Sequence, residues 1–221
     1  MGVPVKMHSY FELTEPAYDL WVEGRLLEEL GIPDDRRTRV EIIGGEIVVS
    51  PVPYFRHAAI ATLIQKEFLR RELSEPSLPW RAVQTINFNL KDIRDGYIPD
   101  LVVLSQTDFD AADAANMLSL TAEQIGMAIE ITSKSTAAED REPGPKRTRR
   151  TKWTGYANEG VGFYLLVDRA PDEPTVTLFS NPNRPLGIFR TEKCWRFGET
   201  VVLPEPFGIE IPTEGWQPWD E

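Results

Sequence analysis

Two acidic residues stand in apolar stretches that have the pattern of buried β-strands. Glu130 lies within Met127–Thr136, where apolar side chains alternate along the chain. Asp100 follows Pro99 at the head of a second apolar run, Tyr97–Leu104. A buried carboxylate is costly unless it is paired, protonated or bound to a metal. Two such residues on neighbouring segments therefore suggest a metal site built on a sheet.

The composition is that of one globular protein with a sizeable core. The chain has 221 residues, of which 41% are hydrophobic and 10% aromatic. No apolar run approaches the roughly 20 residues needed to span a bilayer, and the N-terminus lacks the apolar core of a signal peptide. The single cysteine, Cys194, excludes an internal disulfide and a cysteine-based zinc site. We therefore expect a cytoplasmic protein. The formal net charge of −11 disfavours non-specific nucleic-acid binding by the whole surface, but not a local basic patch.

The elements that must position these residues follow from hydrophobic periodicity. Pro16–Leu30 is expected to form a first helix, and Arg56–Leu73 has the clearest helical spacing of apolar residues. The Gly44-Gly45 pair divides Val40–Ser50 into two β-branched runs and predicts a hairpin. Trp80–Leu90 alternates as a strand does. The Asp100 strand, a short helix near residues 107–116 and the Glu130 strand follow.

Polar residues then separate the Glu130 strand from a second apolar strand. Ser133–Pro145 is expected to be a loop, Lys146–Asn158 a helix, and Gly162–Asp168 a buried strand. Short β runs separated by turns follow at Thr175–Phe179, Gly187–Thr191, Thr200–Leu203 and Gly208–Ile211. This order predicts a single mixed α/β domain over residues 1–221, with a core at about 38–168 and a β-rich extension at about 171–212.

The order of several short motifs resembles a known family. Pro99-Asp100 on one strand and Glu130-x-Thr132 on the next resemble the PD-(D/E)XK nuclease superfamily. More closely, residues from about Leu20 to Ile211 resemble the bacterial Uma-type family of putative restriction endonucleases. The further matching segments are the hairpin Arg39–Pro51 with His57 after it, Ile129–Thr136 with Asp140 after it, Lys152 and Tyr156, and Gly160–Asp168.

The resemblance implies an α/β restriction-endonuclease-like fold, with a mixed sheet flanked by helices. It also implies a catalytic lysine. The superfamily usually places it two residues after the glutamate, where this chain has Thr132. The family often places it on the following helix, which would make it Lys152. Lys134 is nearer in sequence to Glu130, but it lies beyond the end of the strand.

Phosphodiester hydrolysis agrees with these residue types. It needs an activated water and neutralisation of developing negative charge. Mg²⁺ provides both and takes hard oxygen ligands; Mn²⁺ is a possible substitute. Asp100, Glu130 and the backbone carbonyl of Ile131 are the expected metal ligands. Lys152 and Tyr156, spaced i and i+4 on one helix face, could both reach the strands.

Each candidate also has a structural interpretation. Asp100 could cap a turn, and Glu130 could belong to a structural ion pair with Lys152. His57 shares a helix face with Ile60 and is more typical of a core or helix-start histidine; the alternative is a role beside the metal. Glu41 and Glu46 are expected to be solvated, either being an alternative extra ligand, and Asp140 could pair with nearby arginines. The basic run 146–152 could be a solvated face or a phosphate contact.

The resulting hypothesis is a Mg²⁺-dependent DNA endonuclease whose catalytic residues are Asp100, Glu130 and Lys152. The alternative is a catalytically silent nucleic-acid-binding or regulatory module on the same fold, which the acidity and the absent lysine at Thr132 favour. A nuclease acting on RNA or on structured DNA is a third interpretation. The resemblance, together with aromatic residues in the C-terminal tail, predicts a homodimer.

Overall fold

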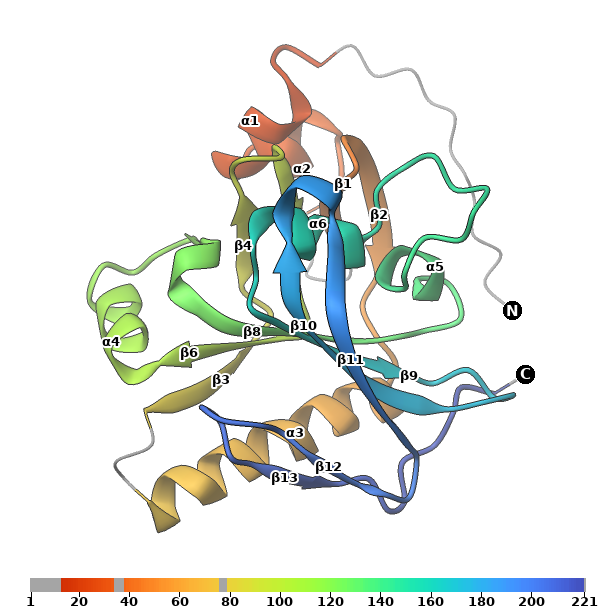
Figure 1. Cartoon of the computed structure of the whole chain (residues 1–221). Helices are drawn as coiled ribbons and strands as arrows, with labels where there is room; N and C mark the ends of the chain where they lie inside the picture. Colours follow the sequence, from red (N-terminus) through yellow and green to blue (C-terminus); the bar gives the residue numbers. More distant parts are fainter. Residues whose placement is uncertain (1–12, 34–37, 76–78, 221) are drawn as a thin grey trace.

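The computed structural model describes residues 13–33, 38–75 and 79–220. Three sheets and the helices between them make up the fold (Figure 1). The helices are α1 (Ala17–Val22), α2 (Leu26–Glu29), α3 (Phe55–Ser74), α4 (Gln106–Ala114), α5 (Ala137–Asp140) and α6 (Lys152–Glu159), with 3₁₀ turns η1 (Ala122–Gln124) and η2 (Arg184–Leu186). The strands are β1 (Thr38–Ile43), β2 (Glu46–Pro51), β3 (Trp80–Gln84), β4 (Asn87–Leu90), β5 (Asp95–Tyr97), β6 (Leu101–Ser105), β7 (Ser119–Leu120), β8 (Ile125–Ile131), β9 (Phe163–Asp168), β10 (Thr175–Asn183), β11 (Ile188–Arg196), β12 (Thr200–Val202) and β13 (Glu210–Pro212).

A six-stranded sheet in the order β11-β10-β9-β8-β6-β3 separates two hydrophobic cores. β8 and β9 run parallel and the other neighbouring pairs antiparallel. On one face Leu101 and Ile129 pack with Ile64 of α3 and with residues of the small β12-β13 sheet. On the other face Val102 and Ala128 pack with α6 and with the five-stranded sheet. Figure 1 shows α3 with β12 and β13 below this sheet and the five-stranded sheet above it. The predicted mixed α/β fold with flanking helices is confirmed.

The hairpin predicted from Gly44-Gly45 is confirmed and forms one edge of the five-stranded sheet, whose order is β2-β1-β5-β4-β7. Both glycines have positive φ, +60° and +78°, as the two central residues of a type I′ turn require. The carboxylate of Asp95 accepts hydrogen bonds from the Gly44 and Gly45 amides at 2.8 and 2.9 Å. Asp95 is fully buried. The buried Asp95 carboxylate therefore fixes the conformation of the hairpin turn.

Two predicted elements are divided in the structure. Instead of one helix over Pro16–Leu30 there are α1 and α2, because Gly24 between them has a φ of +74° and a left-handed residue cannot continue a right-handed helix. Instead of one strand over Trp80–Leu90 there are β3 and β4, which belong to different sheets. Thr85 stands between these strands at a φ of +56°, which a β-branched residue rarely adopts.

The boundaries of the later elements also differ from the prediction. The helix expected over Lys146–Asn158 begins only at Lys152, and the expected loop Ser133–Pro145 contains the short helix α5. The C-terminal β runs are present, but β10 and β11 are longer than predicted and extend the six-stranded sheet beyond β9. No helix in the described ranges is both long and apolar enough to cross a membrane.

Candidate active site

Neighbouring strands bring Asp100 and Glu130 to the same face of the six-stranded sheet. β6 and β8 are antiparallel, with Leu101 opposite Ile129, so the next pair in this register is Asp100 and Glu130. Leu101 and Ile129 face α3, and strand alternation turns Glu130 toward α6, where Lys152 and Tyr156 contact it. Asp100 and Glu130 are 5% and 2% exposed. The sequence expectation that they lie on adjacent strands is met.

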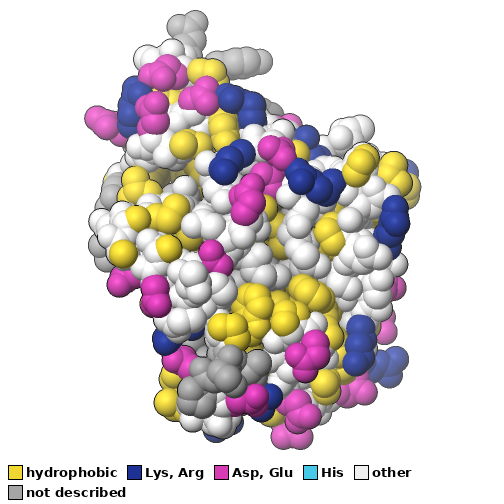
Figure 2. All heavy atoms as spheres, turned by 60° about the vertical axis from the view of Figure 1, so that its left-hand side comes forward, with side chains coloured by type: hydrophobic (Ala, Val, Ile, Leu, Met, Phe, Trp, Pro, Cys, Tyr) yellow, Lys and Arg dark blue, Asp and Glu magenta, His cyan; other side chains and the backbone are white. Residues whose placement is uncertain are grey.

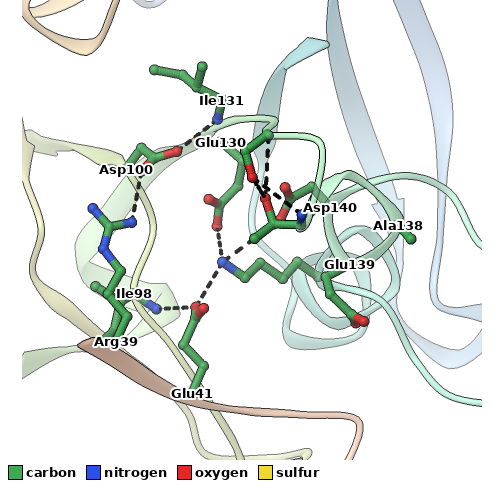
Figure 3. A network of polar contacts seen from close by, with 12 residues as sticks. Arg39, Glu41, Ile98, Asp100, Glu130, Ile131, Ala138, Glu139 and Asp140 are labelled. Carbon is green, nitrogen blue, oxygen red and sulfur yellow. Dashed lines mark hydrogen bonds and ion pairs between the residues drawn. The ribbon is translucent and has the colours of Figure 1, made fainter. Parts of the chain in front are cut away.

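The amine of Lys152 lies among three carboxylates. Its Nζ is 2.7 Å from Oε1 of Glu41, 3.0 Å from Oε1 of Glu130 and 3.9 Å from Oδ1 of Asp140. Figure 3 shows these three acidic side chains converging from different parts of the chain. One helical turn after Lys152, the hydroxyl of Tyr156 donates a hydrogen bond to the same Glu130 oxygen at 2.6 Å. The expected contact between Lys152 and Glu130 is therefore present.

Local sequence explains why Lys152 is the first residue of α6. Thr151 is the N-cap, and its hydroxyl accepts a hydrogen bond from the amide of Thr154 at 3.4 Å. Gly160 ends the helix in a left-handed conformation, at a φ of +87°. The helix packs through Trp153 and Ala157 on the second core. Its first side chain is thereby directed into the space between the two large sheets.

Glu41 is a member of the site that the sequence reading did not assign. It was expected to be solvated, but it is 5% exposed on β1. Its Oε1 accepts the amide hydrogen of Ile98 at 2.7 Å and makes the shortest contact to Lys152. The signal was available, because Glu41 interrupts an apolar strand as Glu130 does.

Glu46, proposed as an additional site residue, lies outside this network. Its side chain is 70% exposed and 3.2 Å from Arg149. It is the first residue of β2 after the hairpin turn, and this position leaves its carboxylate in solvent. The expectation of a solvated side chain is met for Glu46 but not for Glu41, on the other strand of the same hairpin.

Asp100 is held by a separate set of donors. Its Oδ1 accepts a hydrogen bond from Arg39 at 2.9 Å, and its Oδ2 accepts the amide hydrogen of Ile131 at 2.9 Å. The contact from Ile131 thus uses its N–H group, whereas the expected metal ligand was its carbonyl. His57 Nε2 also lies 2.9 Å from Oδ1. Neither ring nitrogen of His57 makes a well-directed hydrogen bond within the described residues. The structure therefore places His57 beside Asp100.

Negative charge exceeds positive charge in this buried cluster. Burial raises the pKa of Glu130 to about 7; the charges of Asp100 and Glu41 add to this effect and Lys152 opposes it. Burial likewise holds the pKa of Asp140 well above its usual range. Among the described residues, the four carboxylates of Glu41, Asp100, Glu130 and Asp140 face two permanent cations, Arg39 and Lys152. Such a cluster favours uptake of protons or of a further cation.

Charged neighbours shift the pKa values of Asp100 and Lys152 against the effect of burial. Burial by itself would raise the pKa of Asp100, but His57 and Arg39 together hold it well below its usual range. Burial by itself would lower the pKa of Lys152, but the three surrounding carboxylates raise it above its usual value. The Lys152 amine consequently stays protonated. It can supply a positive charge to a reaction, but it cannot accept a proton there.

The donor chemistry of the cluster fits Mg²⁺, although no group of three or more His, Cys, Asp or Glu side chains in the described ranges is arranged to hold a metal. Mg²⁺ usually binds one or two carboxylates and completes its shell with water and substrate phosphate. Within the described part of the chain, Glu130 uses only Oε1 for its contacts to Lys152 and Tyr156, which leaves Oε2 for a ligand.

The arginines of the basic run before α6 are bound to the protein itself. Arg147 and Arg149 both pair with Glu139, the latter at 2.6 Å. Arg150 contacts the buried carboxylate of Asp95 at 3.4 Å. Arg149 also donates to the carbonyl of Ile43 at 3.2 Å, so these contacts hold the segment against the hairpin turn. Lys134, the alternative catalytic lysine, is exposed.

Comparisons with known proteins identify the family and the fold. Residues 21–214 match the model of the Uma2 family, which is described as "Putative restriction endonuclease". A crystal structure from Anabaena variabilis ATCC 29413, described as a putative nuclease belonging to DUF820, aligns with a TM-score of 0.55. The alignment covers 82% of this chain and 90% of the other at 20% identity, which supports a common fold. No curated protein matches the chain.

Proposed function

The chain belongs to the Uma2 family of putative restriction endonucleases, and on that premise we propose that it is a Mg²⁺-dependent endonuclease that hydrolyses phosphodiester bonds of DNA. The observation that carries the proposal is the buried cluster of Asp100, Glu130 and Lys152, in which carboxylates outnumber cations. A nuclease needs this combination, because the reaction adds negative charge at the scissile phosphate.

The side chains take separate roles in this proposal. Asp100 and Glu130 hold the metal, which supplies an activated water and neutralises phosphate charge when it is bound. Arg39 and the Ile131 amide orient Asp100, and Tyr156 orients Glu130. Lys152 directs its ammonium toward the same carboxylates and stabilises the negative charge that develops on the phosphate. The backbone carbonyl of Ile131 is the third metal ligand in this proposal.

Cleavage assays test the activity. Purified protein is incubated with plasmid and with labelled oligonucleotides, with Mg²⁺, with Mn²⁺ or with EDTA. We expect phosphodiester cleavage with either metal, none with EDTA and none from Asp100→Ala. RNA oligonucleotides of the same sequence test the choice of DNA. Metal-independent cleavage, or equal cleavage by Asp100→Ala, would contradict the assignment.

A catalytically silent module on the same fold is the second candidate. The observation that favours it is that the Lys152 amine already pairs with Glu41 and Glu130 at 2.7 and 3.0 Å, so its charge is engaged within the protein. Such a protein would bind nucleic acid and leave it intact with every metal. The same assays, combined with an electrophoretic mobility shift, separate the two candidates.

The proposal includes a cytoplasmic homodimer. Family membership supports it, because a restriction endonuclease that cuts both strands of DNA benefits from two active sites. Two of the tail tryptophans, Trp195 and Trp216, are 8% and 6% exposed, so these rings serve packing within the protomer. Light scattering tests the assembly, and a monomer mass at micromolar concentration would contradict it.

A further inference from the structure

The first turn of α3 carries two large aromatic rings in solvent. Tyr54 and Phe55 are each 86% exposed, the highest values among the large hydrophobic side chains of the described residues. Scattered exposed apolar residues are normal, but adjacent rings with almost no contact to their own protein are not. Neither ring contributes to either core.

These rings stand next to the candidate active site. Tyr54 is the N-cap of α3, and its carbonyl accepts the amide hydrogen of His57 at 3.0 Å. His57 in turn has its Nε2 2.9 Å from Oδ1 of Asp100. The connection from β2 therefore leads to Tyr54 and Phe55 and, within one helical turn, to His57.

The surroundings suit a nucleic-acid strand better than an apolar partner. Arg56 follows the two rings directly; its side chain is 55% exposed and pairs at 2.7 Å with Asp220, whose side chain is 88% exposed, so this surface ion pair can exchange for a phosphate. The first backbone amides of α3 have no side-chain cap, which leaves positive partial charge beside the rings. An aromatic ring next to cationic groups provides a stacking surface for a base and a contact for its phosphate.

We propose that Tyr54 and Phe55 bind unpaired bases of the nucleic-acid substrate by stacking, and so select substrates with single-stranded or unpaired segments. This inference rests on the proposed function and adds the form of the substrate. Bases within a duplex are already stacked on their neighbours, so a ring on a protein surface can stack only on a base that is unpaired or displaced.

Fluorescence anisotropy tests the proposal. A labelled oligodeoxynucleotide is offered as a single strand and as its duplex, in EDTA to prevent cleavage, to wild type, Tyr54→Ala, Phe55→Ala and Phe55→Trp. We expect each alanine change to weaken single-strand binding by roughly 5- to 100-fold. Duplex binding should change less, and Phe55→Trp should retain the wild-type affinity.

The matched control is Leu73→Ala, near the other end of α3, where the side chain is 75% exposed and far from the first turn in sequence. It should bind as wild type does. Unchanged single-strand affinity in both alanine variants overturns the proposal. A lower mass of the alanine variants than of wild type in light scattering also overturns it, because the rings would then form a contact between two copies of the chain.

Cleavage assays separate this result from the proposed function. Alanine variants that bind and cleave as wild type does refute stacking alone. Aromatic-dependent binding without cleavage refutes the nuclease alone, and absence of wild-type binding and cleavage refutes both.

Discussion

The ammonium of Lys152 lies within 4 Å of three carboxylates, and its removal should destabilise the fold. Loss of one partner from a buried ion pair costs about 3–5 kcal/mol. In Lys152→Met the free energy of unfolding should fall by about this amount, and any cleavage should fall about 10²–10³-fold, because one electrostatic donor to the phosphate is lost.

The loss of stability in Lys152→Met should depend on pH. Carboxyl groups whose folded pKa is raised favour folding when protonated, and their contribution declines as pH rises through the folded pKa, which for Glu130 is about 7. Without Lys152 these values rise further, so the deficit should be larger at pH 8 than at pH 5. Urea unfolding at both values measures it, with Lys134→Met as the exposed control. Equal deficits at both pH values would indicate a packing effect only.

Glu41 offers a test of the charge excess itself. Because its negative charge contributes to the raised pKa of Glu130, Glu41→Gln should lower that pKa below about 7. The glutamine oxygen can still accept the Ile98 amide, so the strand geometry is kept. Carbon-13 NMR titration of the Glu130 carboxyl measures the change. Glu46→Gln, an exposed change in the same hairpin, should leave the titration unaltered, and equal shifts in both variants would exclude a local effect.

At the level of single residues, the sequence identifies charged side chains that lie in apolar strands. Asp100 and Glu130 were found because each lies in an apolar strand, and Lys152 was assigned from its place in a family motif. Glu41 carried the same strand signal but was interpreted as a solvated hairpin residue. Which of Glu41 and Glu46 joins the site depends on how the hairpin packs against α6. The sequence of the hairpin does not contain that information, because the packing is a tertiary contact.

Among the elements, α6 shows how packing can override helix propensity. Gly155 lies within this helix, where alanine is intrinsically better by about 1 kcal/mol. A Cβ at this position, however, would overlap the Tyr97 hydroxyl, and Tyr97 is fully buried. Gly155→Ala should therefore lower the free energy of unfolding by roughly 1–3 kcal/mol. Gly144→Ala, where an added Cβ meets no atom within 4 Å, is the control and should be close to neutral. A more stable Gly155→Ala variant would contradict this packing.

Element types were predicted better than element boundaries. The Gly44-Gly45 turn is a local signal, because its positive φ values favour glycine, and its hairpin was predicted correctly. The break at Thr85 has no such signal, since a β-branched residue seldom adopts positive φ. The late start of α6 depends on long-range contacts of Arg149 and Arg150 with the hairpin and with Asp95. Periodicity within the segment does not contain that information.

Across the whole molecule, the site joins parts that the sequence pattern does not place together. Glu130 comes from the six-stranded sheet, and Asp100 directly precedes strand β6 of that sheet. Glu41 comes from the five-stranded sheet, and Lys152 comes from α6. The mixed α/β class follows from the order of elements, but the division into two large sheets depends on strand pairing over long sequence separations. On the face that Figure 2 shows, basic side chains are scattered among acidic ones.

Because the site joins both sheets, a cation bound there should stabilise the whole fold. At a concentration 100 times its dissociation constant, a ligand that binds only the folded state contributes about 2.7 kcal/mol. For a chain of this size that corresponds to a rise in melting temperature of roughly 5–10 °C. Protons compete with the metal for Glu130, whose pKa is about 7, so the rise should be larger at pH 8 than at pH 6.

Thermal unfolding with increasing Mg²⁺ or Mn²⁺ measures this effect without any substrate. Glu130→Gln and Asp100→Asn should each remove the metal-dependent rise, whereas Glu46→Gln should retain it. A rise that is independent of pH and survives in Glu130→Gln would place the cation elsewhere on the acidic surface. A rise lost in both site variants and steepest above pH 7 would mean that the excess negative charge between the two sheets is the feature that binds the metal.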